Sequence, residues 1–197
     1  MLVKESNKTA EKRVDPRVKR TRELIVRAFN QLVAEKGHTR LTVQEIAERA
    51  TINRATFYAH FSDQYELFDY VISEAFREEL RRRLPDSPGL SEETLKALVL
   101  AACDYLSGLN TACSRTDRQF RPLIEARVQG ELYRLLLEWI EASPLTGNQP
   151  VAPEVTASVV SWAIFGVGLQ WSRNGATRSV GEAADQALSV IVKGVQL

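Results

Sequence analysis

The chain has 197 residues, of which 44% are hydrophobic and 26% are charged, as in an ordinary soluble globular protein. This length can bury a sizeable core, either in one domain or in two small ones. The N-terminus is charged and lacks an apolar segment, which argues against a signal peptide and for a cytoplasmic protein. The two cysteines, Cys103 and Cys113, fit a reducing compartment and are weak evidence for a redox switch.

The net charge of +1 conceals an uneven distribution along the chain. Residues 1–61 hold 13 Lys and Arg against seven Asp and Glu, a net charge of +6. Residues 62–197 hold 13 against 18, a net charge of −5. A basic N-terminal third on an acidic body is the layout of a DNA-binding head on a regulatory domain. Charge alone is equally compatible with an ordinary solvated surface.

The first elements are an arm and a helix. Residues 1–16 are polar and aperiodic, so we expect a flexible arm, either a plain disordered tail or one whose basic side chains touch DNA, namely Lys4, Lys8, Lys12 and Arg13. A helix is predicted from Arg17 to Glu35, ended by Gly37, because one face carries the apolar stripe Ile25, Ala28, Phe29, Leu32 and Val33. The start of this helix carries a basic cluster suited to a DNA backbone or to plain solvation, made of Arg17, Lys19, Arg20 and Arg22.

The stretch from Thr42 to Phe61 predicts two short helices joined by a tight turn. Thr42 and Glu45 have the spacing of a capping box, and the first helix then shows a narrow apolar stripe of Ile46, Ala47 and Ala50. The chain turns at 51–52, and Asn53 can cap a second helix that runs to about Ala59. That helix would bury Phe57 and Phe61 and expose polar groups, which is typical of a helix-turn-helix with its second helix in the DNA major groove.

Several side chains of this stretch are candidate DNA ligands. Arg54, in the first turn of the second helix, can form a bidentate pair with guanine. The Thr56 side chain offers a hydroxyl for a phosphate and a methyl group for thymine. Thr42 and Val43 open the preceding helix, whose N-terminal amides favour a phosphate. Ala55 belongs to the same candidate set.

The run from Gly37 through Leu67 resembles the DNA-binding domain of the TetR family of bacterial transcriptional repressors. The matching residues are Gly37, Leu41–Val43, Ile46–Ala47, Ala50, Thr56–Tyr58, His60–Phe61 and Glu66–Phe68. The resemblance implies that Tyr58 and His60 contact the phosphate backbone, although His60 can instead be a structural hydrogen-bonding group. Two positions depart from the family pattern. Thr51 replaces the usual Gly, which suggests an altered turn, and Gln64 replaces a Lys that contacts phosphate.

The rest of the chain is predicted to be helical throughout. A helix from Ser62–Asp63 to about Arg83 would link head to body and end at 84–89. Further helices are expected from Ser91 to Leu109, from about Asp117 through Val128, and over 132–140. No stretch alternates as a strand does. We therefore predict an all-α fold of about nine helices, with an arm (1–16), a helix-turn-helix DNA-binding domain (17–61) and a ligand-binding and dimerisation domain (62–197).

The last two predicted helices, about Pro153 to Asn174 and Ser179 to Val195, are apolar. The first contains the uncharged stretch 155–172, which is short for a membrane span and is better explained as a helix buried on more than one side. The family resemblance implies that two such helices from each subunit form a four-helix bundle. A symmetric homodimer of this kind would place two heads on a palindromic operator.

The resemblance also implies a small-molecule inducer inside the body, with an apolar or aromatic compound preferred because no charge cluster marks the region. Candidate pocket residues, each of which can equally be plain core, are Phe76, Cys103, Tyr105, Leu109, Phe120, Ile124 and Trp139. We expect no cofactor and no metal site, because the Cys and His spacing does not suit one. We also expect no enzyme, because the chain lacks the spacing of common catalytic motifs. The expectation is a repressor released by its inducer; an activator, or a DNA-binding adaptor without an inducer, stays open.

Overall fold

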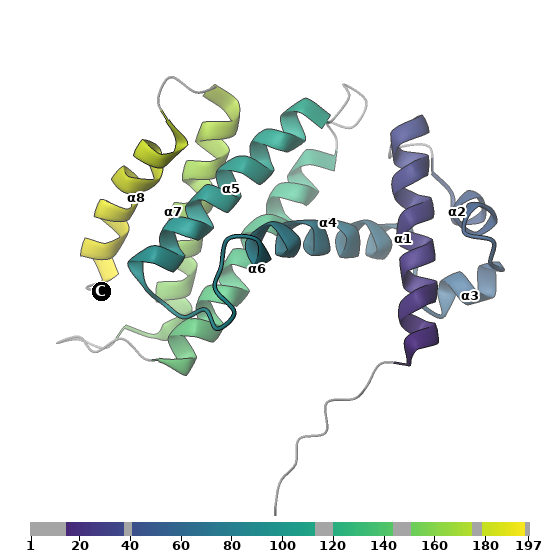
Figure 1. Ribbon diagram of the computed structural model, residues 1–197, viewed down its shortest axis with the longest axis horizontal. Helices are drawn as coiled ribbons and strands as arrows, with labels where there is room; N and C mark the ends of the chain where they lie inside the picture. The colour runs from purple at the N-terminus through teal and green to yellow at the C-terminus, as the bar shows by residue number, and fades with distance from the viewer. Residues whose placement is uncertain (1–14, 38–40, 113–119, 144–150, 175–178, 196–197) are drawn as a thin grey trace, which may run out of the picture.

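The computed structural model describes residues 15–37, 41–112, 120–143, 151–174 and 179–195. Within these ranges the chain forms eight α-helices and no strand, so the predicted all-α fold is confirmed. Helices α1–α3 form a head at one end of α4, and α5–α8 form a helical body at its other end (Figure 1). Their bounds are α1 Pro16–Lys36, α2 Val43–Arg49, α3 Arg54–Tyr58, α4 Gln64–Arg81, α5 Glu92–Ala112, α6 Arg121–Ala142, α7 Pro153–Asn174 and α8 Val180–Val195.

Local chemistry sets the ends of α1. The Asp15 side chain accepts a hydrogen bond from the Arg17 amide at 2.8 Å, and Pro16 stands in the first turn, where its missing N–H costs nothing. At the other end Gly37 adopts φ 74°, and its N–H donates to the Val33 carbonyl at 2.8 Å. The predicted stop at Gly37 is therefore confirmed.

Two ion pairs join α2 to the C-terminal end of α1. Lys36 contacts Glu45 at 2.7 Å, and the Arg49 guanidinium donates two hydrogen bonds of 2.8 Å to the Glu35 carboxylate. These pairs are partly exposed, so they orient α2 more than they stabilise it. The main stabilisation comes from burial of apolar side chains in a shared core, namely Ile25, Phe29, Ile46, Ala47 and Phe57.

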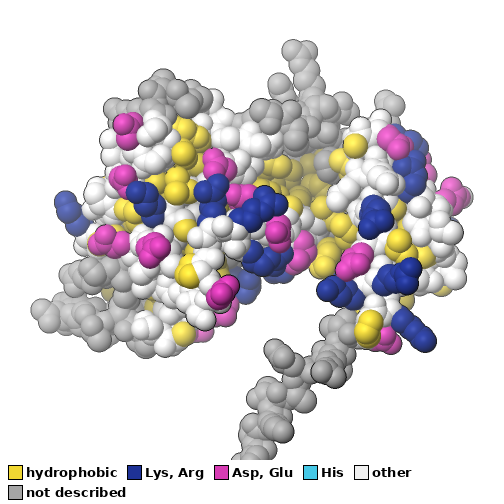
Figure 2. Space-filling model, in the orientation of Figure 1, with side chains coloured by type: hydrophobic (Ala, Val, Ile, Leu, Met, Phe, Trp, Pro, Cys, Tyr) yellow, Lys and Arg dark blue, Asp and Glu magenta, His cyan; other side chains and the backbone are white. Residues whose placement is uncertain are grey.

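Helix α4 belongs to the head at its N-terminus and to the body at its C-terminus. It is capped by Asp63, whose carboxylate accepts from the amides of residues 65 and 66 at 2.8 Å. Phe68 packs edge-on against Phe29 of α1, with ring centroids 6.4 Å apart. Farther along, Phe76 packs on Tyr105 of α5 at 5.2 Å. Hydrophobic side chains also show in the recess between head and body (Figure 2), so one hydrophobic core runs along α4.

In the body, α7 lies against both α5 and α6, and α8 covers α5 and α7. Helices α5 and α7 approach closely at Gly168, where an added Cβ would stand 3.0 Å from the backbone of Ala102. Among the described residues α7 alone is long and apolar enough to cross a membrane, yet it packs within this bundle. The predicted bounds of α7 are those observed, and α8 starts one residue later than predicted.

One predicted division is wrong. The separate helices expected through Val128 and over 132–140 are a single helix, α6, which continues across the exposed Gly130. A helical glycine costs about 1 kcal/mol, which packing of α6 against α4 and α7 outweighs. Pro122 is in its first turn, as tolerated there. Predictions at Asp117, Cys113, His38 and the basic residues of the arm lie outside the described residues.

Candidate nucleic-acid interface

The turn between α2 and α3 has left-handed backbone at Thr51, with φ 57°. The Thr51 amide donates to the Glu48 carbonyl at 3.1 Å and the Ile52 amide to the Ala47 carbonyl at 3.0 Å. This pair of bonds is a Schellman motif, in which the left-handed residue is usually glycine. Contrary to expectation, Thr51 therefore leaves the turn with its usual shape and changes its free-energy cost instead.

Both short helices have side-chain caps at their N-termini. The Thr42 hydroxyl accepts from the Glu45 amide at 3.2 Å, and Glu45 accepts from the Thr42 amide at 3.0 Å, so the capping box is confirmed. At the start of α3 the Asn53 side chain accepts from the Thr56 amide at 2.7 Å and from the Thr56 hydroxyl at 2.9 Å. Since the hydroxyl proton is used in this cap, the Thr56 side chain can offer a base only its methyl group and the acceptor lone pairs of its oxygen.

The buried side of α3 is anchored by aromatic rings. Phe57 is fully buried, and its ring lies 5.7 Å from that of Tyr58 and 5.9 Å from that of Phe61. On the other side Arg54 and Ala55 are exposed, and Tyr58 keeps 47% of its surface accessible. A helix of five residues is thus held from beneath and presents side chains outward.

All seven residues predicted to bind DNA reach the surface of the head. Those exposed are Thr42, Arg54, Ala55 and Tyr58, and those half-buried are Val43, Thr56 and His60. Lys and Arg side chains are spread over the visible face of the head (Figure 2). The pKa of His60 lies below its usual value of 6.5, because partial burial and the nearby charge of Arg22 both disfavour the imidazolium.

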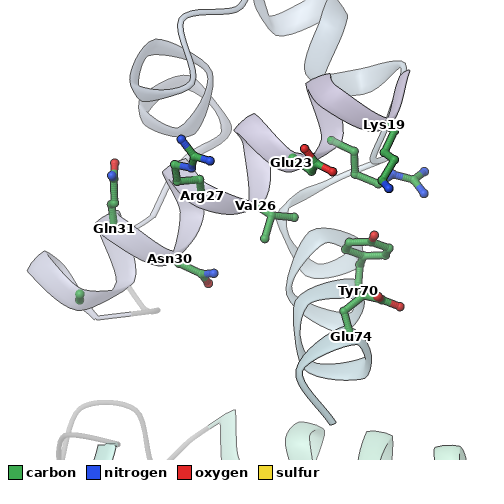
Figure 3. Close-up of a pocket in the computed structure, with 10 residues that line it drawn as sticks. Lys19, Glu23, Val26, Arg27, Asn30, Gln31, Tyr70 and Glu74 are labelled. Carbon is green, nitrogen blue, oxygen red and sulfur yellow. The ribbon is translucent and has the colours of Figure 1, made fainter. Parts of the chain in front are cut away.

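Arg22 has an environment that its place in the basic cluster did not predict. Its guanidinium carbon lies 5.0 Å from the ring centroid of Tyr70 on α4 and 5.5 Å from that of Phe61. Both rings are far from Arg22 in the sequence, so no local sequence pattern predicts the contact. Arg22 also lines an open groove of about 710 Å³ between α1 and α4. Figure 3 shows Tyr70 and Glu74 of α4 beside Lys19, Glu23 and Val26 of α1 in this groove.

None of the predicted pocket residues lines that groove, and Phe120 instead lies beside head residues such as Phe29 and Leu41. Phe76, Cys103, Ile124 and Trp139 are buried, and Tyr105, Leu109 and Phe120 are half-buried. Phe120 packs on Phe68 of α4 with ring centroids 5.2 Å apart. Burial, with a smaller effect of Asp104, raises the pKa of Cys103 to about 11, so this thiol stays protonated and poorly reactive near neutral pH.

Comparison with known proteins decides what kind of head this is. The family model described as bacterial regulatory proteins, tetR family, matches residues 25–71, a range that contains the whole helix-turn-helix. The helix-turn-helix head of this chain belongs to the TetR family.

A curated relative is similar in sequence, and solved structures are similar in fold. An uncharacterised helix-turn-helix-type transcriptional regulator of Bacillus subtilis, YxbF, is 35% identical over 102 residues, which are 51% of this chain and 26% of that relative. The chain therefore spans only part of that relative. Among solved structures, a TetR-family regulator from Streptomyces coelicolor A3 shares the fold over 95% of this chain and 100% of its own, with 17% identity and a TM-score of 0.58. The flavonoid-responsive regulator FrrA covers 89% and 97%, with 20% identity and a TM-score of 0.52.

Proposed function

We propose that this chain is a sequence-specific DNA-binding transcriptional regulator of the TetR family that acts as a homodimer on a palindromic operator. The observation that carries the proposal is the arrangement of α3, which buries Phe57 completely and exposes Arg54, Ala55 and Tyr58. A short capped helix with this distribution suits insertion into a major groove. We further propose that the protein binds DNA without catalysing a reaction and that it is cytoplasmic.

Each residue of the interface has a proposed role. Arg54 reads guanine by a bidentate pair, and the methyl group of Thr56 and the side chain of Ala55 meet base edges. Tyr58 and His60 contact phosphates on one side of the groove. Thr42 and Val43 bring the N-terminus of α2 to a phosphate, where the helix dipole favours the negative charge.

Dimerisation through α7 and α8 is supported by an exposed apolar stripe. Val155, Val159 and Trp162 recur at helical spacing on α7 and are 53%, 63% and 57% exposed. Gly166 continues the stripe with open space beside it, and Val190 on α8 is 73% exposed. Large apolar side chains gathered on one face indicate a protein interface, and a second copy of the same face forms a closed symmetric pair.

We propose that the chain consists of an arm (1–16), a DNA-binding domain (17–61) and a ligand-binding and dimerisation domain (62–197). We propose a repressor that a small apolar or aromatic inducer releases from DNA. The candidate pocket lies around Phe76, Cys103 and Tyr105, beside α4. An inducer there would shift α4 toward a head spacing that no longer fits adjacent major grooves. An activator, or a regulator without an inducer, would use the same DNA interface.

The test is selection of duplexes from a random pool by the full chain at near-physiological salt. We expect a palindrome with half-sites one helical turn or a multiple apart. Recovery of sequence-blind, salt-sensitive binding alone would overturn the proposed function. The selected duplex then serves to screen apolar and aromatic compounds for release, and failure of every compound would favour the regulator without an inducer.

A further inference from the structure

A continuous series of ring contacts connects the candidate recognition helix to α4. The ring of Phe57, in α3, lies 5.9 Å from that of Phe61, which follows the helix. Phe61 in turn lies 5.6 Å from Tyr70, in the second turn of α4. The guanidinium of Arg22, from α1, covers the last two rings at 5.5 and 5.0 Å. Three segments of the head thus meet at one cation.

The contacts of Arg22 with these rings hold its guanidinium, together with the charge of Glu66 on α4. Hydrogen bonds from Ser62, and to a smaller extent the charge of Arg22, lower the pKa of Glu66. Its Nε atom is buried and has no hydrogen-bond partner among the described residues. A flat guanidinium stacks on aromatic faces, whereas an ammonium group is a compact charge on a flexible stem. The position of Arg22 therefore depends on the relative placement of Phe61 and Tyr70, and it constrains that placement in return.

We propose that Arg22 is a positioning residue that fixes the angle between α3 and α4. Through it a tilt of α4 moves the recognition helix, because Phe61 cannot separate from Tyr70 without losing the shared cation. This inference deepens the proposed function and rests on it where DNA is concerned. It differs from the sequence-based interpretation of Arg22 as a phosphate contact, in which the charge alone matters.

Substitutions separate the two roles. Arg22→Lys keeps the charge and loses the stacking, so it would preserve a phosphate contact and break the clamp. Tyr70→Leu removes one ring and no charge. Arg27→Lys is the matched control, since Arg27 lines the same groove on α1 and has no ring or ion-pair contact among the described residues.

The first measurement needs no DNA. Residual dipolar couplings of backbone amides in the full-length protein report the orientation of α3 relative to α4. We expect Arg22→Lys and Tyr70→Leu to change or average that orientation, with the secondary chemical shifts of both helices retained, and Arg27→Lys to leave it unchanged. An unchanged orientation in both clamp variants would overturn the inference, whatever the DNA measurements give.

The second measurement uses the duplex recovered by selection and a random duplex of equal length. We expect both clamp variants to lower the ratio of specific to non-specific affinity by about tenfold, with the effects of the double variant less than additive. Loss of affinity for both duplexes in Arg22→Ala alone, with Arg22→Lys normal, would identify a phosphate contact and reject the clamp. Absence of any preferred duplex for the wild-type chain would reject the proposed function and leave the orientation result standing.

Discussion

Arg77 of α4 donates two hydrogen bonds, of 2.9 and 2.8 Å, to the carboxylate of Glu131 on α6, which is only 7% exposed. Arg134 adds a contact at 3.2 Å, and nearer the head Asp69 of α4 pairs with Arg127 of α6. A bidentate pair at a buried carboxylate is geometrically demanding, so it fixes the register of α4 on the body more than it adds net stability.

Removing one partner of this pair tests that account. Glu131→Gln removes the buried counter-ion of Arg77 and leaves it with Glu74, at 2.9 Å. We expect the free energy of unfolding at pH 7 to fall by about 1–3 kcal/mol, a value reduced because Arg77 is partly exposed and keeps this second partner. Urea denaturation measures it. Glu138→Gln, at an exposed carboxylate that pairs with Arg134 at 3.4 Å, is the control and should change stability by about 0.5 kcal/mol at most.

The same pair predicts a dependence on pH. Burial alone would raise the pKa of Glu131, but the hydrogen bonds and charge of Arg77, with those of Arg134, lower it below 4.5. A depressed folded pKa gives stability that is present above 4.5 and is lost as pH falls through the folded value. The difference in unfolding free energy between wild type and Glu131→Gln should therefore shrink below pH 4.5, and a constant difference would contradict the pairing.

Thr51 offers a stabilising substitution. Its left-handed backbone strains a β-branched residue, and glycine adopts the same φ without a Cβ clash. We expect Thr51→Gly to raise the free energy of unfolding by about 1 kcal/mol. Thr21→Gly, in the second turn of α1, should lower it by a similar amount because glycine disfavours a helix. If thermal or urea unfolding showed that both variants change the free energy of unfolding in the same direction, the strain argument would be refuted.

Arg54→Ala tests direct reading of a base. We expect operator binding to weaken by about 1–3 kcal/mol with relaxed preference at one base pair of each half-site. Arg20→Ala, at the start of α1, should instead weaken binding to all DNA sequences alike. It should also reduce the slope of log affinity against log salt concentration by about one. An Arg54 variant whose ratio of specific to random affinity equals that of wild type would show that Arg54 does not contact a base.

His60 predicts proton uptake on DNA binding. Its free pKa lies below 6.5 through burial and the charge of Arg22, and a phosphate nearby would raise it. The complex therefore binds the proton more tightly than the free protein, and affinity should increase as pH falls from the pKa of His60 in the complex to its lower pKa in the free protein, by about tenfold per pH unit at most. His60→Gln should abolish this dependence, and His38→Gln should retain it.

Trp162→Glu tests the dimer face. A carboxylate in the centre of the exposed stripe on α7 would have to be desolvated in the bundle. We expect monomers by sedimentation equilibrium and operator affinity lower by about 100-fold or more, since the two heads then bind independently. Leu123→Glu, at an apolar residue of α6 that is 47% exposed and outside the stripe, should remain dimeric.

The features that the sequence predicts well are those set within a few residues. The caps at Thr42 and Asn53 and the stop at Gly37 depend on side chains and amides of the same turn, so a short pattern is sufficient. Amphipathic periodicity likewise locates α1 and α4, and an uncharged apolar stretch locates α7. The candidate DNA-binding residues of α3 lie at the surface for the same reason, because Phe57 alone fixes which side of α3 is buried.

The features that the sequence does not predict depend on residues far apart along the chain. Arg22 is indistinguishable from Arg17 or Arg20 in a basic run until Tyr70 is placed beside it. The Arg77–Glu131 pair joins residues 54 positions apart. The continuity of α6 through Gly130 depends on neighbouring helices that outweigh a local preference, which no window of sequence contains.

The close crossing of α5 and α7 at Gly168 has a consequence for how such a regulator can diverge. The backbone of Ala102 lies 3.0 Å from the position that a Cβ on residue 168 would occupy. Because the contact is this close, we expect α5 and α7 to move together as one rigid unit. In the proposed dimer, α4 would then set the distance between the two heads. One residue inserted into that helix would turn the head by about 100° and advance it by about 1.5 Å. New operator spacings should thus arise by changes in whole turns of α4, while the bundle stays as it is.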